Sequence, residues 1–241
     1  MKPQLSVIIP AYNEEKRLPP TLEQVGGYLS AKSWSHEIIV VSDGSADQTA
    51  EVAGCFQEKN FNLLVLEYEP NRGKGYAVKQ GMLKATGRWR LFMDADSSTP
   101  IEELEKLLPH LKTFADNDES GYDIVIGSLA VAGAQINKRE FFLRVAAGKI
   151  GNLLIQWLLL PGIQDTQRGF KLFTAEAAEK IFPQLTVDGW GFDIEALALA
   201  RRFNFSIKEV PVYWSHNSAS KISSWDYLQV LFDLLKLRWP I

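Results

Sequence analysis

The stretch LSVIIPAYNEE, at residues 5–15, decides the fold of this chain. It opens with a short run dominated by apolar and β-branched residues, which is typical of a strand buried on both faces of a sheet. Similar runs occur at residues 37–41 (EIIVV), 63–66 (LLVL), 90–93 (RLFM) and 122–127 (YDIVIG). The pattern therefore predicts five strands in the first half of the chain.

Segments with helix signals separate these runs. Asn13, Ser45 and Thr99 are the expected N-caps, and Thr99 is followed by Pro100 and Glu102 in the order of a capping box. Strands that alternate with helices form βαβ units. We therefore predict an α/β fold with a mainly parallel central sheet.

The second half of the chain is less regular. The expected elements are a long helical region at residues 138–160, strands at 169–173 and 207–213, and helices at 175–182 and 192–202. We find no internal repeat and no linker rich in proline, glycine or serine. The sequence thus predicts one domain over residues 1–241, with halves that meet near residue 127.

Composition limits the function classes that need to be considered. Of the 241 residues, 46% are hydrophobic and 23% are charged, and the formal net charge of -3 gives no support to nucleic-acid binding. The single cysteine, Cys55, cannot close an intramolecular disulfide, and MKPQLSVIIP has no signal-peptide pattern. We therefore expect a cytoplasmic protein.

Two stretches rich in leucine and tryptophan raise the question of membrane contact. Residues 153–163 are too few to span a bilayer, which takes about 20 largely apolar residues. Residues 225–237 mix apolar and charged side chains at helical spacing. Such a helix either covers a face of the core or lies on a membrane surface, and the sequence leaves both open.

An Asp-x-Asp pair, Asp94 and Asp96, follows the fourth predicted strand. Polar residues also follow the first two strands, and the carboxyl ends of parallel strands share one edge of an α/β sheet, where ligands bind. Two carboxylates there can hold a divalent cation whose other ligands are water and substrate phosphates. The alternative is that Asp94 only faces solvent at the strand end and Asp96 only caps a turn.

The segment NRGKG at residues 71–75 is a further phosphate-binding candidate. It has neither the spacing of a nucleotide triphosphatase loop nor the glycine pattern of a dinucleotide-binding turn. Either the turn brings backbone N–H groups, Arg72 and Lys74 toward a diphosphate, or it simply faces solvent.

Four motifs in order, IIPAYNEE (8–15), VVSDGSAD (40–47), NRGKGYAV (71–78) and MDADSSTP (93–100), resemble the nucleotide-binding half of inverting family 2 glycosyltransferases. The second half is similar to dolichyl-phosphate β-glucosyltransferases through GIQDTQRGFKLFT (162–174), WGFDIEALALA (190–200) and EVPVYWSHNSASKI (209–222). The resemblance implies a GT-A fold, in which a Rossmann-like sheet is flanked by helices.

The resemblance further implies a UDP-sugar donor, a Mg²⁺ or Mn²⁺ ion, and transfer of glucose with inversion to a polyprenyl phosphate at the cytoplasmic face of a membrane. The first half, about residues 1–127, would bind the nucleotide sugar, and the second, about residues 128–241, the acceptor. The residues implied for the donor are Pro10, Tyr12 and Glu14 around the nucleoside, Asp43 at the uracil, Lys74 at the diphosphate, and Asp94 with Asp96 at the ribose and metal.

Three departures from the family pattern stand out. Ser42 precedes Asp43 where paired acids are usual, and Leu129 stands where an arginine is expected after the fifth strand. We also expect no amino-terminal transmembrane anchor. The Leu129 departure matters most, because the arginine would face the lipid phosphate.

The acceptor decides which further groups the reaction needs. A hydroxyl acceptor needs a general base, for which Asp193 is the candidate, whereas a phosphate monoester is already anionic and would need Asp193 only for orientation. The predicted catalytic residues are Asp193, Asp96, Arg168 and Lys221. The predicted acceptor-binding residues are Arg139, Arg144, Arg168 and Lys171.

Two other functions remain open from the sequence. The chain could be a family 2 transferase with another sugar or a hydroxyl acceptor, since the nucleotide half would be the same. It could also be a non-catalytic module that binds a nucleotide sugar, although the intact Asp-x-Asp pair favours an enzyme.

Overall fold

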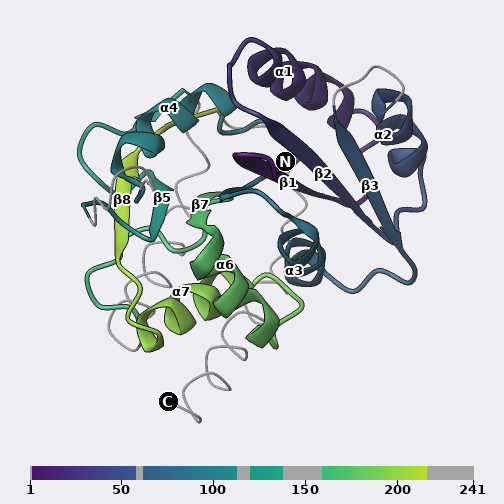
Figure 1. Cartoon of the computed structure of the whole chain (residues 1–241). Helices are drawn as coiled ribbons and strands as arrows, with labels where there is room; N and C mark the ends of the chain where they lie inside the picture. The colour runs from purple at the N-terminus through teal and green to yellow at the C-terminus, as the bar shows by residue number, and fades with distance from the viewer. Residues whose placement is uncertain (1, 58–61, 113–119, 138–158, 216–241) are drawn as a thin grey trace.

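The structure, a computed structural model, describes residues 2–57, 62–112, 120–137 and 159–215. A seven-stranded sheet forms its centre, with the strand order β3-β2-β1-β4-β7-β5-β8 (Figure 1). The strands are β1 (Leu5–Ala11), β2 (His36–Asp43), β3 (Leu63–Tyr68), β4 (Trp89–Met93), β5 (Ile124–Ser128), β7 (Phe170–Thr174) and β8 (Ile207–Pro211). The two short strands β6 (Gln135–Ile136) and β9 (Tyr213–Trp214) pair separately.

The sheet is mainly parallel, as predicted. β1 pairs in parallel with β2 and β4, β2 with β3, and β5 with β8. Only β7 runs antiparallel to its neighbours β4 and β5. Strands from both predicted halves thus share one sheet, because β7 inserts between β4 and β5.

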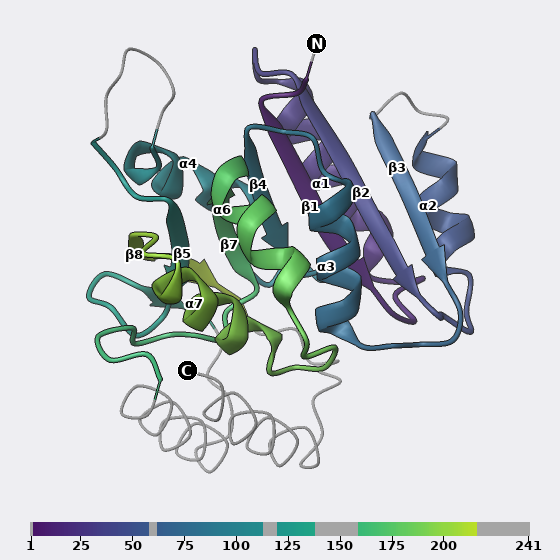
Figure 2. The same ribbon diagram turned by 60° about the horizontal axis from the view of Figure 1, so that its bottom comes forward.

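Helices cover both faces of the sheet (Figure 2). The described helices are α1 (Leu18–Ser30), α2 (Thr49–Gln57), α3 (Lys74–Lys84), α4 (Leu104–Leu107), α6 (Ala175–Ile181) and α7 (Phe192–Arg202), with 3₁₀ turns η1 (Ile101–Glu103), η2 (Leu108–His110) and η3 (Phe182–Gln184). Helices α1, α2 and α4 pack on one face, and α3, α6 and α7 pack on the other.

The apolar runs of the sequence supply both layers of the core. Successive side chains of a strand point to opposite faces, so Val7 and Ile9 pack with α1, whereas Ile8 packs with α3. All three are fully buried. The prediction of strands buried on both faces is therefore confirmed for β1, and β2 repeats the pattern.

All three predicted N-caps are wrong. Helix α1 begins at Leu18 after Arg17, and η1 begins at Ile101 after Pro100, so neither Asn13 nor Thr99 caps a helix. Ser45 lies four residues before the start of α2 and accepts a hydrogen bond from the backbone N–H of Asn13. Asn13 and Ser45, expected to start helices, therefore bind each other's loops instead.

Other predicted bounds fall close to the observed ones. The predicted helix at 192–202 coincides with α7, and the predicted strand at 169–173 is β7 shifted by one residue. The predicted strand at 207–213 ends earlier, at Pro211. Most of the long helical region, residues 138–158, lies outside the described residues.

Candidate functional site

The Asp-x-Asp pair stands at the carboxyl end of β4, where parallel strands β1 and β2 also end. The backbone N–H of Asp94 donates to the carbonyl of Gly169 at 3.2 Å, which extends the pairing of β4 with β7. A Cβ at Gly169 would lie 2.2 Å from Oδ2 of Asp94. A glycine at residue 169 is therefore required for the Asp94 carboxylate to occupy its place.

The turn that carries Asp96 is fastened to the first helix. Thr21 of α1 donates its hydroxyl to the carbonyl of Ala95 at 2.8 Å, and Ser97 donates to the Thr21 hydroxyl at 3.0 Å. The carboxylate of Asp96 accepts from the backbone N–H of Ser98 at 2.9 Å. These contacts fix the direction of the Asp96 carboxylate. The side chains of Asp94 and Asp96 keep 35% and 21% of their surface exposed.

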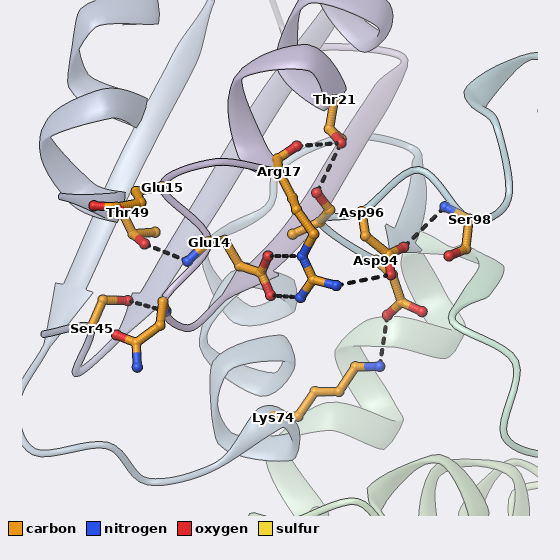
Figure 3. Close-up of polar contacts among 12 residues, drawn as sticks. Glu14, Glu15, Arg17, Thr21, Ser45, Thr49, Lys74, Asp94, Asp96 and Ser98 are labelled. Atoms are coloured by element: carbon orange, nitrogen blue, oxygen red, sulfur yellow. Dashed lines mark hydrogen bonds and ion pairs between the residues drawn. The ribbon is translucent and has the colours of Figure 1, made fainter. Parts of the chain in front are cut away.

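A cation faces each of these carboxylates (Figure 3). Nζ of Lys74, the first residue of α3, lies 2.6 Å from Oδ1 of Asp94. Arg17 binds the Glu14 carboxylate through Nε at 2.6 Å and Nη2 at 2.5 Å, and its Nη1 lies 3.7 Å from Oδ2 of Asp96. Arg17 is not among the residues predicted for the site, although its position three residues after Glu14 is the spacing of a helical ion pair.

Burial and the neighbouring negative charges act in opposite directions on the pKa of Lys74. Burial alone would lower the pKa of its ammonium, but the charges of Asp94 and Asp193 outweigh it, and the pKa is raised. Lys74 therefore carries its positive charge beside the two acids.

The loops after β1 and β2 are tied to each other. The backbone N–H of Asn13 donates to the Ser45 hydroxyl at 3.1 Å, and that of Ala46 donates to Oδ1 of Asn13 at 2.8 Å. Tyr12, next to this junction, keeps 42% of its surface exposed, whereas Pro10 is buried within β1. Of these two predicted nucleoside neighbours, Tyr12 is thus the one whose ring is open to a ligand.

Asp43, predicted at the uracil, is bound to the turn before α3. Its carboxylate accepts from the backbone N–H groups of Arg72 at 3.1 Å and Gly73 at 2.7 Å, and from the side-chain amide of Asn71 at 3.0 Å. The residue is 2% exposed. In this structure Asp43 shapes the turn that places Lys74.

The glycines of this turn admit another segment of the chain. The backbone N–H of Tyr76 donates to the carbonyl of Asp188 at 3.1 Å. A Cβ at Gly73 would lie 2.5 Å from that carbonyl oxygen, and one at Gly75 would lie 2.5 Å from the carbonyl of Val187. The N–H groups expected to bind a diphosphate are thus partly used within the protein, and the Lys74 side chain is the part that faces the acids.

Lys171 and Asp193 form a buried ion pair in the same region. Nζ of Lys171 lies 2.7 Å from Oδ1 of Asp193, and the two side chains are 1% and 5% exposed. Burial raises the pKa of Asp193, with the positive charges of Lys171 and Lys74 acting against it. Lys171, predicted to contact the acceptor, is instead enclosed by protein, because β7 places it beneath the first turn of α7.

Arg168, by contrast, is partly exposed to solvent. Its Nε lies 3.4 Å from Oδ2 of Asp165, its guanidinium lies 5.2 Å from the Trp214 ring, and 29% of its side chain is exposed. Asp165 also accepts from the backbone N–H of Leu129 at 2.9 Å. The other predicted acceptor-side residues, Arg139, Arg144 and Lys221, lie outside the described residues.

The residues at this edge suit a hard divalent cation. Carboxylate oxygens are the ligands that Mg²⁺ and Mn²⁺ prefer. Across the described parts of the chain, no group of three or more histidine, cysteine, aspartate or glutamate side chains is arranged to hold a metal. A cation at Asp94 and Asp96 would therefore take its remaining ligands from water and phosphate oxygens.

Comparison with known proteins agrees with this arrangement. The sequence matches Glycosyl transferase family 2 over residues 6–182. It is 42% identical over 244 residues to dolichyl-phosphate β-glucosyltransferase of Drosophila melanogaster, covering 97% of this chain and 74% of the relative. The human protein of that name is 38% identical over 247 residues, covering 98% of this chain and 75% of the relative.

The fold is shared with a bacterial enzyme of known structure. Glucosyl-3-phosphoglycerate synthase from Mycobacterium tuberculosis, in complex with Mn²⁺, UDP-glucose and phosphoglyceric acid, superposes with a TM-score of 0.69 at 18% identity, covering 98% of this chain and 80% of that one. The family match spans most of the chain, and the Asp-x-Asp pair at the carboxyl end of β4 lies within it. The chain therefore belongs to glycosyl transferase family 2, and is similar over nearly its whole length to dolichyl-phosphate β-glucosyltransferases.

Proposed function

We propose that the protein transfers glucose from UDP-glucose to dolichyl phosphate or a related polyprenyl phosphate, with inversion at the sugar carbon. The similarity to dolichyl-phosphate β-glucosyltransferases, at 35% to 42% identity over nearly the whole chain, carries this proposal. The charged groups around Asp94 and Asp96 support it, because they suit the diphosphate of such a donor.

The reaction exchanges one C–O bond for another. A phosphate oxygen of the acceptor bonds to C1 of glucose, the bond from C1 to the β-phosphate oxygen breaks, and its electron pair leaves with UDP. The transition state resembles an oxocarbenium ion, and negative charge grows on the departing diphosphate. Groups that bind this growing charge raise the turnover rate rather than only tightening binding.

Among the described residues, Lys74 and Arg17 are cations placed to act on that charge. Both pair with the acidic residues at the end of β4, so a diphosphate held there would lie next to them. A Mg²⁺ or Mn²⁺ ion held by Asp94 and Asp96 would supply Lewis-acid stabilisation of the leaving oxygens. Glu14 would hold Arg17 in place through its paired hydrogen bonds.

For the nucleoside we propose contacts at the rim formed by the loops after β1 and β2. The exposed Tyr12 ring would pack against the nucleoside, and the buried residues Pro10 and Glu14 would support the loop that carries Tyr12. Asp43 would contact the uracil while its carboxylate also holds the turn before α3. Asp94 would serve the ribose as well as the metal.

On the acceptor side, Arg168 is the described cation best placed to meet a phosphate, since its guanidinium is partly exposed beside Trp214. Arg139, Arg144 and Lys221 remain proposals for the same role. Asp193 would orient a phosphate acceptor, or act as general base if the acceptor were a hydroxyl.

A polyprenyl substrate brings the enzyme to a membrane. In the described part of the chain, no helix is long and apolar enough to cross a bilayer. We propose peripheral attachment at the cytoplasmic face, through the amphipathic pattern at residues 225–237. Liposome flotation of the full chain, compared with a chain ending before Trp225, tests this. Equal flotation of the two proteins would reject the role of that segment.

The activity itself is tested with the purified full chain, UDP-glucose, Mn²⁺ and a short-chain dolichyl phosphate. We expect UDP release that depends on the lipid phosphate, and a glucosylated lipid product. Parallel reactions replace UDP-glucose by UDP-galactose, or dolichyl phosphate by dolichol. Activity with either replacement alone would favour another family 2 transferase, and UDP binding without turnover would favour a non-catalytic module.

A further inference from the structure

The ion pair between Lys171 and Asp193 lies directly against the donor site. Nζ of Lys171 lies 5.9 Å from the centre of the Phe92 ring, and Nζ of Lys74 lies 5.3 Å from the same centre. Phe92 immediately precedes Met93 and Asp94 in the chain. Two ion pairs, Lys74 with Asp94 and Lys171 with Asp193, therefore share one aromatic ring as a neighbour.

Lys171 is committed to contacts inside the protein. Its ammonium donates to Oδ1 of Asp193 at 2.7 Å and to the backbone carbonyl of Arg168, and the side chain is 1% exposed. An ammonium that reaches solvent this little cannot meet the headgroup of a lipid. Its two acceptors instead join the Asp193 carboxylate to the loop that carries Arg168.

Lys171 is the main influence that opposes the effect of burial on Asp193. A carboxylate that is taken out of water favours its protonated form unless a partner compensates, and burial is the largest influence that raises the pKa of Asp193. The positive charges of Lys171 and Lys74 lower this pKa, and the negative charge of Asp94 raises it. Of the two lysines, only Lys171 donates a hydrogen bond to Asp193 among the described contacts, whereas Lys74 binds Asp94.

We propose that Lys171 is a positioning residue, which holds the Asp193 carboxylate charged and directed at the donor site and acts on the reaction only through Asp193. This rests on the proposed glucosyl transfer. Lys171 thereby moves from the acceptor-binding set to the support of Asp193, while Arg168 stays on the acceptor side.

A kinetic double-mutant cycle tests the proposal. The proteins are the full-length wild type, Lys171→Met, Asp193→Asn and the double variant, with Lys84→Met on the exposed end of α3 as a matched control. We expect each single variant to lose about 100-fold in kcat, the size of loss that misplacement of a reacting group produces. Because Lys171 acts only through Asp193, we expect the double variant to lose about the same factor.

Other outcomes would overturn the proposal. A double variant that loses the product of the two factors, about 10⁴-fold, would show that Lys171 acts independently of Asp193. A Lys171→Met protein with unchanged kcat and a raised KM for dolichyl phosphate would return Lys171 to the acceptor site. The KM for UDP-glucose and the dissociation constant of UDP, expected to stay within a factor of two or so of wild type, show that each protein is folded.

Unfolding of the same four proteins tests the ion pair without any acceptor. Lys171→Met leaves a buried carboxylate unpaired, so we expect it to have the lowest denaturation midpoint, and the double variant to recover part of the loss. A double variant no more stable than Lys171→Met would refute the pairing. If the wild type transfers no glucose to dolichyl phosphate but this coupling is present, the proposed function fails and the pair stands.

Discussion

Asp94 and Asp96 each face a cation from elsewhere in the chain. Asp94 faces Lys74, the first residue of α3, and Asp96 faces Arg17, which directly precedes α1. Without these cations two neighbouring carboxylates would repel each other and any diphosphate. With both cations present, a negatively charged diphosphate could bind at the carboxyl end of β4 beside the two carboxylates. Lys74 would pass from a partner of Asp94 to a partner of the donor phosphate.

Asp96→Asn tests the role of the acid pair. The amide keeps an oxygen to accept from the N–H of Ser98, so we expect stability to change by no more than about 0.5 kcal/mol. We expect kcat to fall by about 100-fold or more, since stabilisation of the leaving diphosphate is lost. Steady-state kinetics with UDP-glucose and dolichyl phosphate measure this, with Glu176→Gln on the exposed surface of α6 as the control for loss of one charge. Turnover at the control level would remove Asp96 from the mechanism.

Helix α3 is positioned by the close approach of the segment before α7. A Cβ at Gly75 would lie 2.5 Å from the carbonyl of Val187 and 2.6 Å from Cβ of Phe192, so glycine is required by packing. The motif NRGKG therefore has two structural roles. Its glycines let α3 and the 187–189 segment meet, and its lysine faces the acids.

Gly75→Ala and Gly54→Ala form a matched pair of helix substitutions. We expect Gly75→Ala to destabilise the protein by about 1 to 3 kcal/mol through overpacking, and to impair turnover because Lys74 moves. At Gly54, in α2, an added Cβ would have nothing within 4 Å, so alanine there should stabilise by up to about 1 kcal/mol. Denaturant unfolding measures the free energy of unfolding of both variants, and the m-value should stay constant. Equal changes in stability for the two variants would contradict the close packing at Gly75.

Asp123 fastens the start of β5 to the residue before β8. Burial would raise its pKa, but hydrogen bonds from Lys112, from the Ser206 N–H at 2.8 Å and from the Ser206 hydroxyl at 2.7 Å outweigh burial, and the pKa is lowered. A carboxyl with a lowered folded-state pKa stabilises the fold above its unfolded pKa of about 4. That stabilisation is lost as the pH falls further, through the folded-state pKa.

Asp123→Asn should therefore be less stable than wild type at pH 7, by about 1 to 3 kcal/mol. Below about pH 4 the difference should shrink, because the wild-type carboxyl takes up a proton there and loses its advantage. Unfolding free energies measured from pH 7 down to pH 3 give this comparison, with Glu176→Gln as the control. A difference that stays constant across this range would show that the ionised form of Asp123 contributes nothing.

The whole sheet organises the site, because strands from both halves of the chain meet at one edge. β1, β2 and β4 come from the first half, and β7 inserts beside β4, so that Gly169 lies against Asp94 and Lys171 lies near Phe92. A donor bound at this edge would contact residues far apart in the sequence. Ligand binding should therefore stabilise the molecule as a whole.

UDP together with Mn²⁺ should raise the thermal unfolding midpoint. At 100 times the dissociation constant a ligand adds about 2.7 kcal/mol, which for a chain of this size corresponds to a shift of about 5 to 10 °C. We expect UDP without metal to give a smaller shift, and the metal-dependent part to vanish in Asp96→Asn. Scanning calorimetry with and without EDTA measures both. The same metal-dependent shift in Asp96→Asn and wild type would place the ion elsewhere.

Much of the fold and part of the site could be predicted from local sequence. The run LSVII buries its side chains on both faces of the sheet, and the other apolar runs also form strands, so they fix the edge at which polar residues gather. The Asp-x-Asp pair follows a strand for the same reason, and the structure places it at the shared edge. Helix starts were predicted less well, because Asn13 and Ser45 bind each other's loops rather than a helix end.

The tertiary structure alone decided which charges meet. Lys171 and Asp193 are 22 residues apart, and nothing in the local pattern shows that β7 runs antiparallel beneath α7 and buries them together. The pairing of Arg17 with Asp96 and the burial of Asp43 have the same origin. Apolar periodicity acts over a few neighbours and fixes the elements, whereas the partner of a charged side chain depends on how those elements pack across the chain.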